Sequence, residues 1–391
     1  MDYSQKSYGR NAEVADIFRQ FNAGFDISMP GPRRLGKTFV LDRLVDAGPL
    51  NGWKAIKIEV AGCADTNALF RKISLKIADQ MHAAKRSVHW LRQRAGQVTN
   101  PRTTSSGNWY QQPLSLDHET NFGRHIKEMN KSKKHQWALL VDELPIFLKA
   151  LHDQGEQGVA TARDFMNHLS ALSVDYPKVR WLITGSIGLE PLAQAGNYMG
   201  VLAKFRPFTL DTLTHEQARD FVIDSASIGK LMYRQKISTV EANAIINATG
   251  WRAAFYLDAV ANQLRGALTE DAEQANALVE EAVKKLLSPI GSSTFGVWEE
   301  HLRKHYRSND RSNAIVILNA LSQHSLGLSL NSLLTTIASP KMTAENLRQL
   351  LWRLDAEGFV NVDNWDSTDS ITSFRNILLR RWWLRFPPST T

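Results

Sequence analysis

One stretch of the sequence, from Gly31 to Thr38, has the residue types and spacing of a loop that holds phosphate. It fits the pattern G-x-x-x-x-G-K-[ST] with no mismatch. Glycines let the backbone wrap around phosphates, so its N–H groups and the next helix start point at their oxygens. Lys37 is expected to reach the β- and γ-phosphates, and the Thr38 hydroxyl to coordinate Mg²⁺. The predicted nucleotide contacts are Gly31, Pro32, Arg33, Arg34, Leu35, Gly36, Lys37 and Thr38.

The sequence around this loop argues against a fortuitous glycine-rich turn. Phe25 to Met29 is a short β-like run, and Lys37 to Val45 has helical periodicity. A strand, a glycine-bounded turn and a helix form the context in which this motif is a P-loop. The chain is therefore predicted to bind ATP or a similar nucleotide.

A carboxylate pair follows a second predicted strand. Trp137 to Val141 is a continuous apolar run, and Asp142 and Glu143 come directly after it. Mg²⁺ needs oxygen ligands near the P-loop threonine, so Asp142 is the predicted second metal ligand. Glu143 is placed to activate the attacking water. Alone, the pair could equally cap a helix, but the upstream P-loop favours ATP and Mg²⁺ as cofactors of one site.

Small hydroxyl residues follow a third predicted strand. The run from Val179 to Ile183 ends in Thr184-Gly185-Ser186. Thr184 or Ser186 could sense the γ-phosphate by hydrogen bonding, and the alternative is a turn with hydroxyl caps.

The order of elements predicts an α/β protein with three parts. Strands alternate with helices in residues 1–212, which predicts a parallel sheet with a P-loop NTPase core and a polar insertion at about 97–118. Strand signals then disappear, so residues 213–290 are predicted to form an all-α lid. In residues 291–391, helices followed by a β-hairpin predict a winged-helix domain.

The chain resembles the AAA+/STAND group of P-loop ATPases, with the archaeal-type ATPases and the replication-initiator-like branch as the nearest relatives. The resemblance rests on the RRLGKT, LLVDE and ITGS stretches and on the lid turn Gly250-Trp251-Arg252, and it spans nearly the whole chain. Archaeal-type ATPases often have Gly-x-Pro at that turn, so this chain is closer to the initiator pattern. The resemblance implies an ATP hydrolase that works as a homo-oligomer.

The resemblance also assigns roles to single residues. It implies that Gly9 and Arg10 help to hold the adenine, and that Thr184 or Ser186 is the first sensor. Arg252 matches the second sensor in the lid, although a surface arginine near a helix start is the alternative. A neighbouring subunit is expected to supply an arginine finger, for which Arg206 is only a weak candidate.

Composition bounds the partners and the location. The net charge of +8 fits a polyanionic partner as well as an ordinary solvated surface. A single cysteine, no apolar signal segment and no apolar run long enough to span a membrane lead us to expect a cytoplasmic protein without membrane contact.

The predicted winged helix leaves its partner open. Its helix from Thr343 to Glu357 could enter a major groove with Arg348 and Arg353 toward DNA, but acidic residues on this helix and in the wing oppose phosphate. DNA and an effector protein are both candidate partners. We expect an ATP-driven switch that signals to one of them, and the resemblance suggests phage defence or mobile-element biology. The alternative is a DNA-binding regulator or transposition adaptor in which ATP is mainly a structural or assembly ligand.

Overall fold

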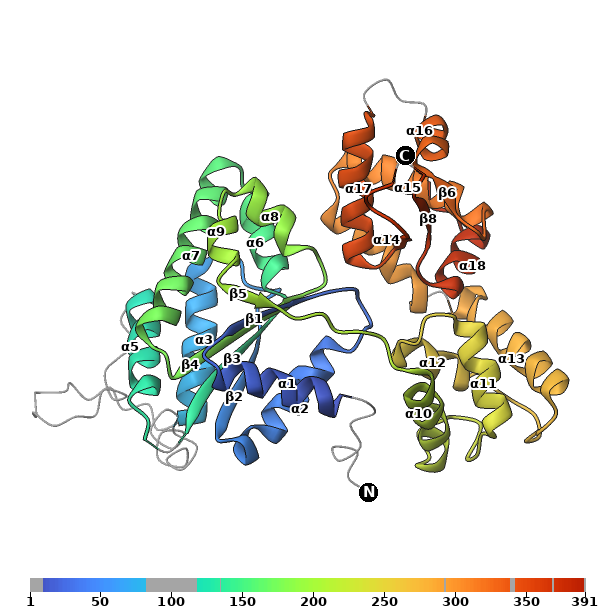
Figure 1. Ribbon diagram of the computed structural model, residues 1–391, viewed down its shortest axis with the longest axis horizontal. Coiled ribbons are helices and arrows are strands. Elements are labelled where there is room, and N and C mark those ends of the chain that lie inside the picture. The colour runs from blue at the N-terminus through green and yellow to red at the C-terminus, as the bar shows by residue number, and fades with distance from the viewer. Residues whose placement is uncertain are drawn as a thin grey trace, which may run out of the picture.

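The computed structural model describes residues 10–81, 118–133, 135–291, 293–337, 342–367 and 369–389. It contains an α/β core, a group of helices beside it and a C-terminal domain above those helices (Figure 1). Gly9 and residues 97–117 of the predicted insertion lie outside the described ranges. Within those ranges, no helix combines the length and apolar character needed to cross a membrane.

The core is built on a five-stranded parallel sheet with the order β2-β3-β4-β1-β5. Its central strands are almost completely buried, because helices cover both faces, and this explains their continuous apolar sequences. The strand after β4 was not predicted, since β5 is a short edge strand. The strands are β1 (Asp26–Pro30), β2 (Trp53–Glu59), β3 (Gln136–Asp142), β4 (Val179–Gly185) and β5 (Phe205–Pro207).

Side chains alternate between two apolar cores on the faces of this sheet. On β3, Ala138 and Leu140 face the core that includes α1 and α2, whereas Leu139 and Val141 face the core with α3, α5, α6 and α7. The core helices are α1 (Asn11–Asn22), α2 (Lys37–Ala47), α3 (Thr66–Met81), α5 (His118–Asn130), α6 (Leu144–His152), α7 (Glu156–Asp175), α8 (Leu189–Ala195) and α9 (Met199–Leu202).

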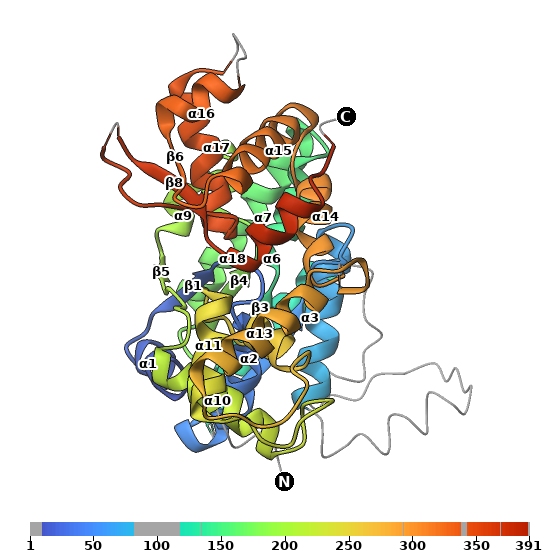
Figure 2. The ribbon, with the colours of Figure 1, turned by 90° about the vertical axis from the view of Figure 1, so that its right-hand side faces the viewer.

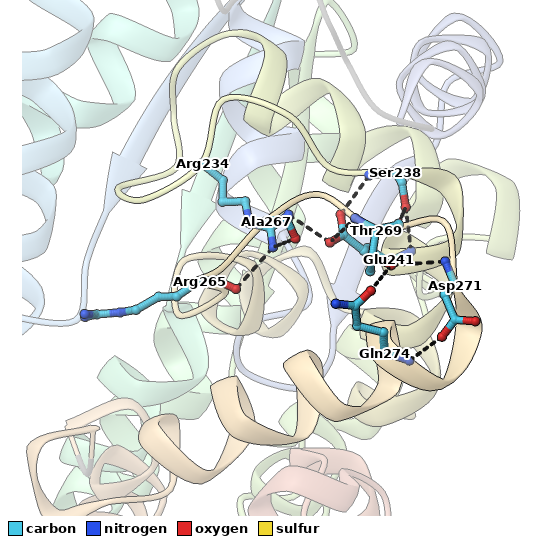
Figure 3. Close-up of polar contacts among 8 residues, drawn as sticks. All are labelled: Arg234, Ser238, Glu241, Arg265, Ala267, Thr269, Asp271 and Gln274. Atoms are coloured by element: carbon cyan, nitrogen blue, oxygen red, sulfur yellow. Dashed lines mark hydrogen bonds and ion pairs between the residues drawn. The ribbon is translucent and has the colours of Figure 1, made fainter.

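The lid follows a linker after β5 and contains α10 (His215–Ser227), α11 (Thr239–Thr249), α12 (Ala254–Ala261) and α13 (Ala272–Leu286). A buried polar network ties its loops together (Figure 3). Arg234 donates to Glu241 at 2.8 Å and to the carbonyls of Arg265 and Ala267 at 3.1 and 2.9 Å. Glu241 also caps the start of α11 through the backbone N–H of Ser238. The loop before α11 and the loop after α12 are therefore joined by hydrogen bonds between residues of the lid itself.

The C-terminal domain has the helices and the small sheet of a winged helix, as the order of predicted elements led us to expect. The antiparallel sheet has the order β6-β8-β7. The helix α14 was not predicted from sequence. The elements are α14 (Ser293–His305), α15 (Ser308–Gln323), β6 (Leu328–Ser329), α16 (Leu330–Ile337), α17 (Ala344–Glu357), β7 (Val360–Val362), β8 (Ile371–Phe374) and α18 (Ile377–Arg385). Short 3-10 turns, Gly48–Asn51 and Pro289–Gly291, complete the regular structure.

Candidate nucleotide-binding site

The predicted phosphate loop joins the end of β1 to the start of α2. Gly36 has φ 99°, in the left-handed region that favours glycine, and α2 begins at the next residue. Arg34 is also left-handed at φ 69°, which is unusual for a residue with a side chain. The backbone N–H of Gly31 donates to the carbonyl of Gly185 at 3.2 Å, so the loop is anchored to the end of β4. The helix start therefore points into the loop, the geometry of an anion site.

Lys37 lies inside this loop and is buried. Its Nζ donates to the carbonyls of Gly31 and Pro32 at 2.6 and 2.7 Å. Burial lowers the pKa of Lys37 to about 8, although the carboxylates of Asp142 and Glu143 act in the opposite direction. An ammonium group that is poorly solvated and surrounded by a loop of main-chain groups is suited to bind an anion.

Thr38 and Asp142 meet although they are 104 residues apart in the chain. The Thr38 hydroxyl donates to Asp142 Oδ2 at 3.1 Å. Burial raises the pKa of Asp142, and the charge of Glu143 raises it further. A hydroxyl and a carboxylate side by side, with a second carboxylate close by, form an oxygen donor set that a divalent cation would stabilise. The residues therefore fit the Mg²⁺ that the P-loop implies.

Glu143 is held in place by the end of the neighbouring strand. The backbone N–H and the hydroxyl of Ser186 both donate to Glu143 Oε2, at 2.9 and 3.0 Å. Glu143 itself has φ 61°, a costly conformation that is found more often at functional sites than elsewhere. Ser186 was predicted as a phosphate sensor, but here it contacts the carboxylate expected to act on water. Its position therefore favours orienting Glu143.

Thr184 does not face the loop. Its hydroxyl donates to the carbonyl of Met29 at 2.6 Å, so it bridges β4 and β1 inside the sheet. This corrects the expectation that Thr184 could sense phosphate, because its only hydroxyl proton is engaged with a buried carbonyl. The glycine between the two hydroxyl residues has a packing reason, since a Cβ on Gly185 would lie 2.5 Å from Pro145 Cδ.

The other predicted contacts lie at the margins of the loop. Arg10 donates to Glu13 Oε1 at 2.6 Å and to the carbonyl of Leu35 at 3.1 Å, so it links α1 to the phosphate loop. Arg252 donates through Nε to the carbonyl of Leu213 at 2.7 Å, which ties the lid to the linker. Gly9, the second residue predicted near the base, lies outside the described residues. Arg206, the weak finger candidate, lies on β5 with its guanidinium 4.5 Å from the Phe25 ring centre.

A cavity of about 550 Å³ opens beside the phosphate loop, and three parts of the chain line it besides the loop. They are the linker from Thr209 to Thr212, the lid at Gly250 and Trp251, and the winged-helix domain around Phe374 and Arg375. The linker and winged-helix residues were missed from sequence, because no motif marks them and they come to the loop only through folding.

The winged-helix arginines differ from the prediction. Arg353 donates to Glu357 Oε1 at 3.1 Å and to the carbonyl of His305, and it stacks on the ring of Tyr306. The expectation that Arg353 faces a duplex is therefore wrong for this structure, because its guanidinium is turned into the domain. Arg348 lies half-buried on the same helix. Trp382 and Trp383, which lie between arginines on α18, are buried and pack inside the domain.

The sheet order, the phosphate loop, the carboxylates after β3, the helical lid and the winged helix together define the fold of an AAA+ P-loop ATPase. This confirms the predicted fold class.

Solved structures similar over nearly the whole chain agree. The Walker-type ATPase PABY2304 of Pyrococcus abyssi has 13% identity and a TM-score of 0.62, over 97% of this chain and 96% of that one. The Aeropyrum pernix ORC2 protein, in ADPNP-ADP complexes, has 12% identity and a TM-score of 0.53, over 97% of this chain and 93% of that one. No protein-family model and no curated protein matches the sequence.

Proposed function

We propose that this protein is a Mg²⁺-dependent ATPase that works as a nucleotide-driven switch. The observation that carries the proposal is the meeting of Lys37, the Thr38–Asp142 pair and the Ser186-bound Glu143 at the carboxyl ends of β1, β3 and β4. A site that only held a nucleotide would have no need of a positioned carboxylate beside the phosphates.

The residues divide the work of hydrolysis between them. Lys37 and the start of α2 would bind the β- and γ-phosphates, and Thr38 with Asp142 would hold Mg²⁺, which would neutralise charge on the phosphates. Glu143 accepts a proton from the water that attacks the γ-phosphorus. The bond to the β-phosphate oxygen breaks, so ATP and water yield ADP and phosphate. Ser186 keeps the Glu143 carboxylate aimed during this step.

The nucleotide state of the switch controls binding of DNA or of a partner effector protein at the winged-helix domain. Arg348 on α17 is partly exposed, and its charge supports DNA because it would attract phosphate. The exposed Asp363, Asp366 and Asp369 of the wing would repel phosphate and therefore support a protein partner. A homo-oligomer is part of the proposal, and it rests on the resemblance, which implies an arginine finger supplied by a neighbouring subunit. We also propose a cytoplasmic role in phage defence or mobile-element biology, which rests on the resemblance stated above.

A second candidate is a DNA-binding regulator or transposition adaptor in which ATP serves structure or assembly. The exposed face of α17 favours it. Asn346 and Gln349 lie there beside Arg348, and amide side chains of this kind read base edges in a major groove.

Turnover measurements test the first candidate. Lys37→Ala should abolish both ATP binding and turnover. Glu143→Gln keeps the size and the Ser186 contact, so it should bind ATP with wild-type affinity and lose turnover by at least about a hundredfold. Lys131→Ala, which removes an exposed lysine paired with Glu128, is the matched control. Wild-type turnover in both site variants would refute the assignment.

Gel-shift titrations separate the two candidates. An adaptor binds duplex DNA at low salt whether or not Glu143→Gln has blocked turnover. A switch changes its DNA or effector binding between the ATP-locked Glu143→Gln protein and the ADP-bound wild type. Equal binding by these two forms contradicts the switch.

A further inference from the structure

Arg34 is a residue of the phosphate loop whose side chain leaves the loop. Its guanidinium carbon lies 3.9 Å from the centre of the Phe255 ring, which belongs to α12 of the lid. This is a cation–π distance. The backbone of Arg34 is left-handed, with φ 69°. The loop that holds phosphate is therefore in direct contact with the lid.

The lid helix that carries Phe255 is joined to the winged-helix domain by shared aromatic packing. Tyr256, the next residue, is fully buried and accepts a hydrogen bond from Trp298 Nε1 at 2.8 Å. Its ring stacks on Phe295 with centroids 6.0 Å apart, and Phe295 stacks in turn on Trp382 at the same separation. These rings come from α12, α14 and α18, so lid and winged helix share one core.

Polar and close backbone contacts strengthen that junction. Arg381 on α18 donates to both carboxylate oxygens of Glu280 on α13, at 2.5 and 3.1 Å. A Cβ on Gly250 would lie 2.3 Å from Ile377 Cδ1, so the lid turn needs glycine to pack on α18. Figure 2 shows the winged-helix domain directly above the lid, with α18 next to α11 and α13.

The core touches this combined body at the phosphate loop. Besides the Arg34–Phe255 contact, a Cβ on Gly358 would lie 2.4 Å from Pro32 Cβ, so the turn after α17 packs on the loop. Two positions of the loop, Pro32 and Arg34, therefore contact the two domains that the aromatic core joins.

We propose that Arg34 is a positioning residue that fixes the lid and the winged-helix domain, as one rigid body, over the phosphate loop. Arg34 acts through its contact with the Phe255 ring. The packing of Tyr256 against Trp298 and Phe295 then holds the winged helix in a fixed position relative to the lid. Lid closure then moves the winged helix by the same rotation about the linker. This proposal adds a positioning residue to the proposed switch. The nucleotide titration below depends on the proposed ATPase function, whereas the distance measurement without nucleotide does not.

Distances between spin labels test the rigid body without nucleotide. Labels on cysteines at the exposed positions Asp164 (core), Glu273 (lid) and Gln349 (winged helix) are introduced pairwise into a Cys63→Ala background. Arg34→Ala should broaden the core–lid and core–winged-helix distances together and leave the lid–winged-helix distance unchanged. Arg265→Ala is the matched control, since it removes a cation–π contact of 3.9 Å with Tyr233 within the lid. It should change none of the three distances.

Two results of the distance measurement would overturn the proposal. In one, the lid–winged-helix distance broadens as much as the others, so the two domains are not one body. In the other, Arg34→Ala has no more effect than Arg265→Ala, so the contact does not fix the lid.

Titration with a fluorescent ATP analogue tests the positioning role. Arg34→Ala and Phe255→Leu should each weaken binding about threefold, and the double variant no further, because both remove one contact. Arg34→Lys should recover part of the loss. Fully additive losses contradict action through Phe255. Failure of the wild type to bind the analogue would refute the proposed ATPase, and the nucleotide-free distances would still decide the role of Arg34.

Discussion

The nucleotide site and the winged-helix domain both contain buried charges, but these charges have opposite surroundings. In the winged helix, Glu357 is fully buried and is met by His301 Nε2 at 2.7 Å, the Tyr306 hydroxyl at 2.9 Å and Arg353 Nε at 3.1 Å. In the nucleotide site, the hydrogen-bond partners of Lys37 Nζ among the described residues are the main-chain carbonyls of Gly31 and Pro32, and Glu143 has a strained, left-handed backbone.

This difference distinguishes buried charged side chains that stabilise the fold from buried charged side chains that are positioned for a ligand. Burial opposes ionisation of Glu357, yet His301 and Arg353 hold its pKa below the usual value. Burial of Lys37 lowers its pKa, and its neighbours do not restore it. Groups whose charged form is disfavoured until a partner arrives are characteristic of functional sites.

The largest expected effect is on the satisfied cluster. Glu357→Ala leaves Arg353 and His301 buried without their carboxylate and should lower the free energy of unfolding by about 3 kcal/mol. Urea titration followed by circular dichroism measures this loss. Glu280→Ala is the matched control, because it breaks a pair with Arg381 in which Glu280 is 44% exposed. It should cost at most about 1 kcal/mol, and equal losses would contradict the contrast between the two kinds of pair.

The binding residues of the nucleotide site could be predicted from sequence where they belong to short motifs of consecutive residues. The motif from Gly31 to Thr38 lies next to a strand and a helix, and Asp142 follows the apolar run from Trp137 to Val141, so the local sequence was sufficient to predict each. Their meeting followed from parallel topology, which brings strand ends to one edge.

The misread residues depend on contacts that sequence does not contain. All seven residues of β4 are buried, so burial on both faces erased the alternation that would have told which way Thr184 points. Arg353 reads as a surface cation, but its partners are four residues along the helix and on α14, a helix that was itself not predicted. The winged-helix residues at the cavity are more than 300 positions from the loop they approach.

The second prediction is a gain in the free energy of unfolding, whereas the first is a loss. Lys37→Met removes a buried ammonium of lowered pKa and should raise the free energy of unfolding at pH 7 by about 1–3 kcal/mol. Between pH 8 and 10.5 the unfolded chain binds the Lys37 proton and the folded chain does not, so wild-type stability rises with pH there. The variant lacks this rise. Unfolding curves of both proteins at pH 7 and pH 9.5 measure it, and a less stable variant at pH 7 would refute the assignment of Lys37 as unsatisfied charge.

The third prediction concerns Glu143, a carboxylate of the nucleotide site that accepts two hydrogen bonds from Ser186. Ser186→Ala removes the hydroxyl donor to Glu143 and leaves the backbone donor at 2.9 Å. Turnover should fall about tenfold through misorientation of Glu143, and nucleotide affinity should stay within about twofold. Thr184→Val, two residues earlier, is the matched control, because its hydroxyl bonds to Met29 inside the sheet. A loss of affinity in Ser186→Ala as large as the loss of turnover would instead favour direct contact with phosphate.

The smallest expected effect compares the two arginines of α17. If DNA is the partner, Arg348→Ala should weaken duplex binding about threefold and lower the salt dependence by about one unit of slope. Arg353→Gln removes the charge together with the inward contacts of the guanidinium, so it should reduce stability and leave the salt slope unchanged. Fluorescence anisotropy with a labelled duplex across salt concentrations gives both slopes. A change of slope in Arg353→Gln as large as that in Arg348→Ala would mean that Arg353 turns outward on DNA, and the contrast between the two regions would no longer hold for this helix.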